Sequence, residues 1–536
     1  MDNNRIADRL EAFASLLELG EANPYTARAY RRAAETIRDA GFPVAELVAA
    51  GRARELRGIG PRIEARLREL VETGSIAELA ELERELAPEL VGFGRYLGLS
   101  AKRSLDIAQA LGVRTADEFR AAAAAGRLRS VPGIGPKIEA RLLEALAREE
   151  EPRPRRGLLL NRAWELVGGV AAALGGEPAG DVRRWRDSCE RLAVVVAAAE
   201  ASPVLDEFAE LPQIVSLIER EERRAVGVTV DGVPLELSVA EPEHLGAELL
   251  RATGSSAYVE ALEPLPDSAD EAGVYRALGL PWCPPELREE PFREEPPALV
   301  EPADIRGDLH SHTTWSDGRA SVEEMGRAAR ERGYEYLAIC DHTPAVGAVR
   351  GLTPDDVRRQ GDEIAVANEL LAPFRLLRGI ECDILPDGRL DLPDDVLAEL
   401  DWVQASVHGG QRMPRREMTK RVVEALRNPH VRCLSHPTGR YIGRRPENAL
   451  DLERAFEVAL EHGVAVEVNG LPDRLDLSGA HAREALRAGL RIVCSTDAHS
   501  ERGLANMPLS VATARRGWAR AADVLNTRPL QDLLGL

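Results

Sequence analysis

The sequence predicts a multidomain protein with an all-α N-terminal region, an α+β middle region and a C-terminal region in which strands alternate with helices. Its 536 residues exceed what one hydrophobic core usually organises. Two charged, proline-bearing stretches, Glu149–Arg156 and Pro284–Pro302, mark domain boundaries. We therefore expect domains at residues 1–80, 81–150, 157–290 and 304–536, with residues 291–303 as a linker.

The spacing of apolar residues distinguishes the three regions. In residues 1–150, helical spacing predicts short helices at Ile6–Leu19, Ala27–Ile37 and Ile63–Val71. The middle region combines a predicted helix at Leu158–Ala173 with predicted strands at Leu192–Ala197, Ala225–Val230 and Val233–Ala240. Beyond Ala303 the alternation is typical of β/α barrels or doubly wound sheets. The strands predicted there are Ile305–Leu309, Tyr336–Cys340, Phe374–Ile380, Trp402–Val407, Arg432–Ser435, Ala465–Val468 and Arg491–Ser495.

The composition is that of a globular protein, with 44% hydrophobic and 29% charged residues. No apolar run approaches the roughly 20 residues that span a bilayer, and the first residues lack a secretory signal. We expect a cytoplasmic protein without membrane contacts. Six cysteines without a CxxC pair predict buried free thiols. The net charge of −20 argues against a broad nucleic-acid-binding face, so any DNA contact must be local.

Residues 56–67 recur almost unchanged as residues 131–142, and each copy contains a GxG turn between two short helices. Glycine lets the backbone approach a ligand closely, and the following helix can present its N-terminal amides to a phosphate. This helix-hairpin-helix arrangement binds the DNA backbone without reading bases, and it would make the protein nucleoid-associated. The alternative is a glycine C-cap in an ordinary helical bundle. The residues predicted to contact DNA are Gly58, Gly60, Arg62, Gly133, Gly135 and Lys137.

Histidines and carboxylates follow the ends of the predicted C-terminal strands, where active sites of β/α barrels collect. A spacing of two turns His310 and His312 to one side of an extended chain. Six of the ten histidines take strand-end positions, whereas His430, His462 and His481 are typical of surface helices or loops. The predicted metal ligands are His310, His312, Asp317, His342, Glu381, His408, His436, Asp497 and His499.

Imidazole and carboxylate ligands without cysteine favour manganese or zinc, with iron as an alternative. Nine ligands exceed the number that one ion takes, so we expect two or three divalent ions bridged by Glu381. Such centres activate water and stabilise phosphate charge, which predicts phosphoester hydrolysis with Glu381 and Asp497 in catalytic roles. Arg440 is a candidate bidentate donor to the phosphate, with an ordinary surface arginine as the alternative.

These nine residues resemble the ligand set of the PHP (polymerase and histidinol phosphatase) superfamily, which implies a distorted (β/α)7 barrel with a trinuclear site. The resemblance assigns His310, His312, Glu381 and Asp497 to the first ion, Glu381, His408 and His436 to the second, and Asp317, His342 and His499 to the third. The whole chain is similar to bacterial family X DNA polymerases with a C-terminal PHP domain. Besides the two hairpins, this similarity is carried by Asn23–Ala34, Thr253–Ser255, Tyr275–Pro281 and Pro284–Arg288.

The resemblance implies a nucleotidyltransferase-like palm and thumb at residues 157–290, but the palm departs from the family pattern. That family holds two magnesium ions with three palm carboxylates, whereas here Arg191 and Ala193 stand at the first two positions and Glu236 at the third. Asp181 replaces a serine that would contact the triphosphate. One carboxylate cannot hold two ions against a triphosphate, and Arg191 adds positive charge where a cation should bind. We therefore expect the palm to be inactive in synthesis.

Related enzymes also carry a Schiff-base lysine in the first hairpin, and Arg66 occupies its position here. Arginine has no free amine at neutral pH, so abasic-site lyase chemistry by that route is not expected.

The leading hypothesis is a DNA-associated, metal-dependent 3′–5′ exonuclease or 3′-end-processing enzyme of DNA repair, which binds gapped or 3′-ended DNA through its hairpins. A phosphatase for small phosphate monoesters is a second hypothesis, because superfamily barrels without polymerase domains have that activity and because the chain is acidic. A third hypothesis is a non-enzymatic protein that binds DNA ends, and a fourth is an active gap-filling polymerase.

Overall fold

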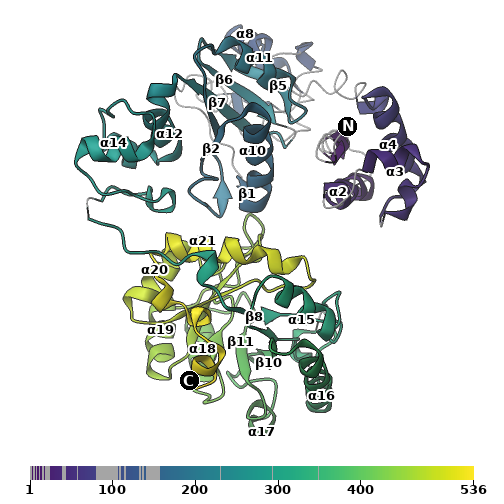
Figure 1. The fold of residues 1–536 in the computed structure, drawn as a ribbon, viewed down its shortest axis with the longest axis vertical. Coiled ribbons are helices and arrows are strands. Elements are labelled where there is room, and N and C mark those ends of the chain that lie inside the picture. Colours follow the sequence, from purple (N-terminus) through teal and green to yellow (C-terminus); the bar gives the residue numbers. More distant parts are fainter. Residues whose placement is uncertain are drawn as a thin grey trace. The chain divides into compact units, whose positions relative to one another are not determined.

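The computed structural model describes residues 24–38, 44–79 and 157–535 apart from positions 57, 230, 293 and 348, with individual residues in 3–17 and short pieces in 107–139. The chain divides into two compact units (Figure 1). The first comprises Met1–Leu158, Arg162–Arg183 and Cys189–Gly279, and the second comprises Leu159–Asn161, Arg184–Ser188 and Leu280–Leu536. In the described residues, no helix is both long and apolar enough to cross a membrane.

The N-terminal part of the first unit is helical. Its elements are α2 (Pro24–Arg38), α3 (Val44–Ala49), η1 (Ala53–Glu55) and α4 (Pro61–Thr73), followed by α8 (Ala116–Ala124) and η2 (Arg127–Ser130). The predicted helices Ala27–Ile37 and Ile63–Val71 lie inside α2 and α4, and their apolar faces bury residues such as Ile37 and Leu67. The amphipathic spacing therefore identified the helices of this small core.

The two hairpin copies repeat the same backbone hydrogen bonds. In each copy, the amide of the isoleucine within the GxG turn donates to the carbonyl oxygen three residues earlier. The carbonyl oxygen of the second glycine then accepts a hydrogen bond from the amide four residues later, at the start of the next helix. Gly133 and Lys137 lie outside the described residues. The equivalent bonds are Ile59 N to Leu56 O (3.2 Å) and Ile134 N to Val131 O (3.1 Å), then Glu64 N to Gly60 O (2.9 Å) and Glu139 N to Gly135 O (3.0 Å).

A five-stranded mixed sheet in the order β2-β4-β7-β6-β5 forms the rest of the first unit. Its strands are β2 (Glu177–Gly180), β4 (Leu192–Ala197), β5 (Ile214–Arg220), β6 (Arg224–Thr229) and β7 (Pro234–Ala240). The predicted strand at Leu192–Ala197 matches β4, and the other two predicted strands overlap β6 and β7. The helices are α10 (Leu160–Leu174), α11 (Ser202–Glu210), α12 (Leu245–Thr253), α13 (Ser256–Glu260) and α14 (Glu271–Leu278); the short strands are β1 (Leu158–Leu159) and β3 (Ser188–Cys189).

The second unit is a parallel seven-stranded barrel in the order β14-β13-β12-β11-β10-β9-β8. A parallel bridge between Ser311 and Ala498 joins its two outermost strands, so the barrel is nearly closed. All seven predicted strands are present, with shifted ends. They are β8 (Gly307–Ser311), β9 (Tyr336–Ile339), β10 (Arg375–Asp383), β11 (Trp402–Ser406), β12 (Cys433–Leu434), β13 (Ala465–Asn469) and β14 (Ile492–Ser495).

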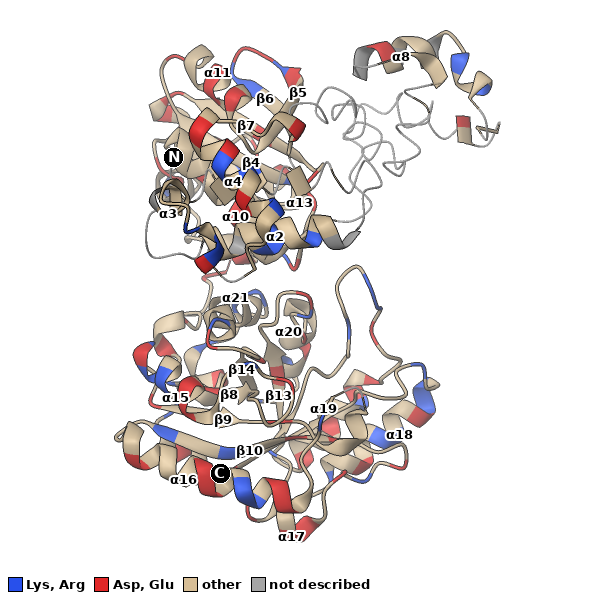
Figure 2. Cartoon of the chain, turned by 90° about the vertical axis from the view of Figure 1, so that its right-hand side faces the viewer, with Lys and Arg blue, Asp and Glu red and all other residues tan. Residues whose placement is uncertain are grey.

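Helices surround these strands (Figure 1). Capping boxes begin α15 and α16, because Ser321 and Thr353 bond to the amides three residues later. Both acidic and basic residues occur along outer helices such as α15, α16 and α18 (Figure 2). The helices are α15 (Val322–Glu331), α16 (Pro354–Leu371), α17 (Asp394–Leu397), α18 (Arg415–Leu426), α19 (Leu452–Glu461), α20 (Gly479–Arg487), α21 (Met507–Arg516) and α22 (Leu530–Leu534).

The proline-rich stretch expected to act as a linker is instead packed within the barrel unit. Val300 is fully buried, and its amide donates to Ala519 O at 2.9 Å. Phe292 packs edge-on against Trp518, with ring centroids 4.8 Å apart. The prolines and charges of this stretch predicted a linker, but apolar side chains between the prolines have partners in the barrel unit.

Candidate metal centre

The barrel gathers all nine predicted ligands at the carboxyl ends of its strands. His310 is in β8 and Glu381 in β10, while the other ligands follow strand ends in short loops. His310 Nε2 and Asp497 Oδ1, far apart in sequence, lie 3.6 Å apart. Among the described non-glycine residues, His436 and Asp497 are two of the few with positive φ, at 24° and 53°. Such backbone strain is often stored at functional sites, and here it occurs at two predicted ligands.

Glu381 lies at the centre of the cluster and is 1% exposed. Its two carboxylate oxygens face different imidazoles, as expected of a carboxylate that bridges ions. Oε2 faces His342 Nδ1 at 2.9 Å, His310 Nε2 at 3.5 Å and His312 Nε2 at 3.6 Å, and Oε1 faces His436 Nε2 at 2.7 Å and His408 Nε2 at 3.4 Å.

Three groups of ligand atoms are close enough to share an ion: His310, His312 and Asp497; His342, Glu381 and His408; and His312, Asp317, His342 and His499. The groups differ from the assignment implied by the resemblance: Glu381 is absent from the first group, His436 belongs to none of the three, and two histidines have additional partners. His312 belongs to two groups, and His342 approaches Glu381 as well as Asp317, whose Oδ1 is 3.6 Å from His342 Nε2. Both imidazoles lie between neighbouring groups, because the strand ends that carry them are adjacent in the barrel.

The donor atoms fit divalent cations. Within the part of the chain that the structure describes, both Glu381 oxygens, both His436 nitrogens and Nδ1 of His312 and His342 are buried without a hydrogen-bond partner. Buried polar atoms are otherwise nearly always paired, because an unpaired one costs about 1–3 kcal/mol. Their short separations without hydrogen-bond geometry indicate lone pairs directed at common points, as in a metal site.

Charge keeps the carboxylates ionised despite burial. Burial disfavours the anion, but His408, His342 and His310 hold the pKa of Glu381 well below its usual range. Burial likewise opposes protonation of His342, but Glu381 and Asp317 raise its pKa to about 10. Burial, with His499 and His342 nearby, lowers the pKa of His312 to about 3. A cation entering this cluster therefore meets anionic carboxylates and displaces protons from imidazole.

An outer ring of carboxylates orients the ligands, and sequence reasoning missed it. Glu467 Oε1 lies 2.7 Å from His310 Nδ1, and its Oε2 accepts from the His436 amide at 2.6 Å. Asp383 Oδ2 lies 3.3 Å from His408 Nδ1. Such contacts fix the imidazole tautomer and direct the opposite nitrogen at the metal. The available signal was the position of Glu467 in a predicted buried strand, where an unpaired carboxylate would be costly.

Arg440 follows His436, but its observed partners belong to the protein. Its Nε donates to Arg474 O at 2.9 Å and its Nη2 to Leu475 O at 2.5 Å. Nη2 also pairs with Asp187 Oδ2 at 2.8 Å. These bonds brace the loop between β13 and α20, and none of them involves a predicted metal ligand.

The first hairpin leaves its predicted DNA contacts accessible. Arg62 is exposed, and Gly60 is the N-cap of α4 without a side-chain cap. Gly58 has φ 87°, and nothing in the described residues lies within 4 Å of where a Cβ would stand on Gly58 or Gly60. The backbone is therefore open to close approach at the start of α4, as phosphate binding requires.

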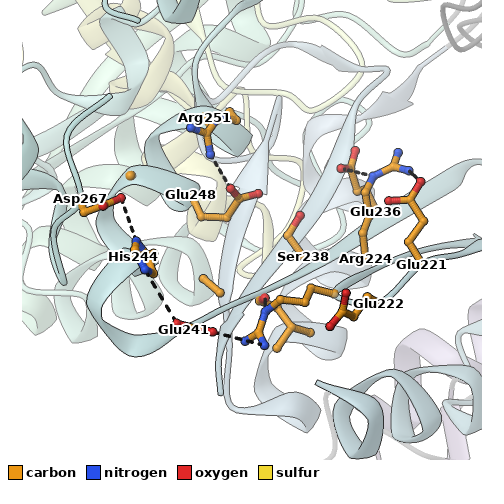
Figure 3. A pocket seen from close by; sticks show the side chains of 14 residues that line it. Glu221, Glu222, Arg224, Glu236, Ser238, Glu241, His244, Glu248, Arg251 and Asp267 are labelled. Atoms are coloured by element: carbon orange, nitrogen blue, oxygen red, sulfur yellow. Dashed lines mark hydrogen bonds and ion pairs between the residues drawn. The ribbon is translucent and has the colours of Figure 1, made fainter. Parts of the chain in front are cut away.

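Two of the residues expected at palm carboxylate positions lie on neighbouring strands. Ala193 of β4 pairs in register with Glu236 of β7, and Arg191 directly precedes β4. Glu236 Oε1 accepts a 2.8 Å bond from Arg224 Nε in a charged cleft of about 800 Å³ (Figure 3). Asp181 Oδ2 accepts the amides of Glu190 and Arg191 at 2.7 and 2.8 Å. The remaining carboxylates here are thus satisfied by protein donors.

Comparison with known proteins agrees with this architecture. Residues 1–76 match a helix-hairpin-helix domain, residues 97–148 a SAM-like helix-hairpin-helix tandem and residues 308–469 the PHP domain. The chain is 33% identical to the DNA polymerase/3′-5′ exonuclease PolX of Bacillus subtilis (strain 168) over 99% of both chains. A probable phosphatase of Acetivibrio thermocellus is 33% identical over 36% of this chain and 78% of its own length.

PHP domains are metal-dependent hydrolases, and the ligand cluster described above has the donors that they require. The hairpin matches indicate DNA binding. The likeness to PolX extends over the whole chain, whereas the likeness to the phosphatase covers only part of it. The chain therefore belongs to the family X DNA polymerases that carry a C-terminal PHP domain.

Proposed function

We propose that this protein is a metal-dependent 3′–5′ exonuclease that trims DNA ends during repair and has lost polymerase activity. The observation that carries the proposal is the nine-ligand cluster around Glu381, in a chain that also carries two helix-hairpin-helix motifs. The B. subtilis relative is named for 3′-5′ exonuclease activity, which supports DNA as the substrate. Manganese is the ion that we would supply first, and two or three ions suit the number of ligands.

Residues of this chain prepare the site in two ways. Divalent ions held by the nine ligands would neutralise phosphate charge and make a water nucleophilic near neutral pH. Glu467 and Asp383 hold the Nδ1 atoms of His310 and His408, so that each Nε2 faces Glu381. Except for Asp317, His408 and His499, the ligand side chains are less than a tenth exposed, which limits competing bulk water.

Loss of synthesis is supported by the palm. Nucleotidyl transfer needs carboxylates that are free to hold two magnesium ions. At the corresponding positions stand Arg191, Ala193 and Glu236, and Glu236 is paired with Arg224. Asp181 accepts two backbone amides, so its carboxylate stabilises the start of β4.

The test compares three reactions of the purified full chain with manganese or zinc. We expect stepwise release of nucleotides from 3′-labelled single-stranded and gapped DNA, little turnover of p-nitrophenyl phosphate, and no incorporation of labelled nucleotide into gapped duplex with magnesium. Phosphomonoester turnover with intact DNA would overturn the exonuclease assignment in favour of a small-molecule phosphatase. Incorporation of nucleotide would overturn the proposed loss of synthesis.

A further inference from the structure

Arg474 is a buried cation beside the metal ligands. It lies in the loop between β13 and α20 and is 6% exposed. Its Nε is 3.9 Å from Asp497 Oδ2, beyond hydrogen-bond distance, and this buried nitrogen has no hydrogen-bond partner among the described residues. Asp497 Oδ2 is already bonded to Asn469 Nδ2 at 3.0 Å. The guanidinium therefore has an unused donor next to a predicted ligand.

The far edge of the same guanidinium is firmly held. Its Nη2 donates to the Tyr441 hydroxyl at 2.8 Å, and Arg474 Cζ lies 4.4 Å from the centre of the Tyr441 ring. Arg445 packs at the same distance from that ring. These contacts fix the direction of the guanidinium plane, because the aromatic ring and its hydroxyl restrain one group together.

The backbone of Arg474 is braced as well. Arg440 donates to the carbonyls of Arg474 and Leu475, and Asp187 in turn pairs with Arg440. Leu475 has φ 42°, a left-handed conformation that a leucine rarely adopts without such support. The loop is thus held in a shape that keeps Arg474 directed at the ligand cluster.

Burying a guanidinium is costly unless an anion compensates it. Asp497 is the nearest carboxylate, but as a metal ligand it would share its charge with the ions. Cations bound to the cluster would then leave Arg474 in an environment of excess positive charge, which a phosphate oxygen would neutralise. Arginine forms short, charge-assisted bonds to phosphate in a water-poor site.

We propose that Arg474 binds a non-bridging oxygen of the scissile phosphate and that Arg440 and Asp187 are positioning residues for it. This inference rests on the proposed function, since it assigns a substrate contact to the same centre. It transfers the phosphate-binding role expected of Arg440 to Arg474, whose free Nε is better placed.

The experiment measures binding of inorganic phosphate to the manganese-loaded full chain by calorimetry, with the metal content of each variant determined in parallel. We expect Arg474→Gln to keep its bound metal and to weaken phosphate binding about 10- to 100-fold, as for loss of a charge-assisted bond. Arg474→Lys keeps the positive charge but lacks the planar guanidinium with its several donors. Its affinity for phosphate should therefore lie between those of the wild type and Arg474→Gln. Arg389→Gln, at an exposed arginine of the barrel unit that pairs with Asp387, is the control and should bind phosphate like the wild type.

Unchanged phosphate binding in Arg474→Gln would overturn the inference. Loss of bound metal from both Arg474→Gln and the conservative Arg474→Lys would also overturn it by making Arg474 a support for Asp497. Because inorganic phosphate is the probe, the result is independent of DNA hydrolysis. If phosphate binding depends on Arg474 but the protein does not cleave DNA, the role of Arg474 in binding phosphate is supported and the proposed exonuclease activity is refuted. For the positioning role, Asp187→Asn should weaken phosphate binding by less than Arg474→Gln, with metal content unchanged.

Discussion

The barrel and the palm both bring charged side chains together at strand ends, but they satisfy them differently. In the barrel, both oxygens of Glu381 are buried without a hydrogen-bond partner in the described residues. In the palm, Glu236 is paired with Arg224, and Asp181 accepts two amides. Carboxylate oxygens that no protein group satisfies are available to cations, whereas the palm carboxylates already have protein donors. This difference supports the proposal that the barrel holds metal ions and that the palm does not.

The largest effect is expected from removing ligands of the barrel. We expect His310→Ala/His312→Ala to lower manganese-dependent release of 3′ nucleotides by at least about 1,000-fold, since metal activation supplies several kcal/mol to such reactions. His430→Ala, outside the cluster, is the control and should retain full activity. If the double variant still hydrolyses DNA, the barrel cluster is not the hydrolytic site, and the difference drawn between barrel and palm is wrong.

A smaller effect is expected from the outer carboxylate Glu467. Its substitution in Glu467→Gln should weaken manganese binding about 10- to 100-fold, because His310 would lose the anion that orients its ring. Metal titration followed by dialysis measures the change. Glu331→Gln, an exposed site on α15, should bind manganese like the wild type. Equal affinities in the two variants would show that Glu467 does not orient the ligand.

Metal binding should also depend on pH in a defined direction. The pKa of His342 is raised to about 10 by Glu381 and Asp317 against the effect of burial, so this imidazole is protonated at pH 7 in the metal-free protein. An ion must displace that proton, so affinity should rise about tenfold per pH unit between pH 6 and 8 for each proton released. Calorimetry in buffers of different ionisation enthalpy counts the protons. An affinity that falls with rising pH would contradict this charge assignment.

The smallest effect concerns the palm pair. Arg224→Ala should lower the free energy of unfolding by about 1 kcal/mol, because Glu236 would lose its partner at a half-buried position. The variant should still incorporate no nucleotide with magnesium, since Arg191 and Ala193 supply no carboxylate. Thermal unfolding and a gap-filling assay test the two parts. Synthesis gained by this single change would show that Arg224 alone had blocked the palm.

Sequence reasoning located the barrel strands and the nine residues that cluster at their ends because their signals are local. Buried parallel strands form apolar runs, and each ligand stands beside one, as His342 stands just beyond β9. β2 was missed because Glu177–Gly180 contains a proline and only a short apolar stretch. The roles of Glu467 and Arg474 depend on partners from other strands and loops, which no local pattern specifies. The packing of Val300 could not be predicted either, because its partner Ala519 is far away in the sequence.

The most direct test follows nucleotide release from 3′-labelled gapped DNA with manganese in three full-length proteins: wild type, His310→Ala/His312→Ala and Glu236→Gln. We expect equal release by the wild type and Glu236→Gln, and none above background by the double histidine variant. Equal release by all three, or loss of release in Glu236→Gln alone, would contradict the claim that the barrel centre performs the reaction.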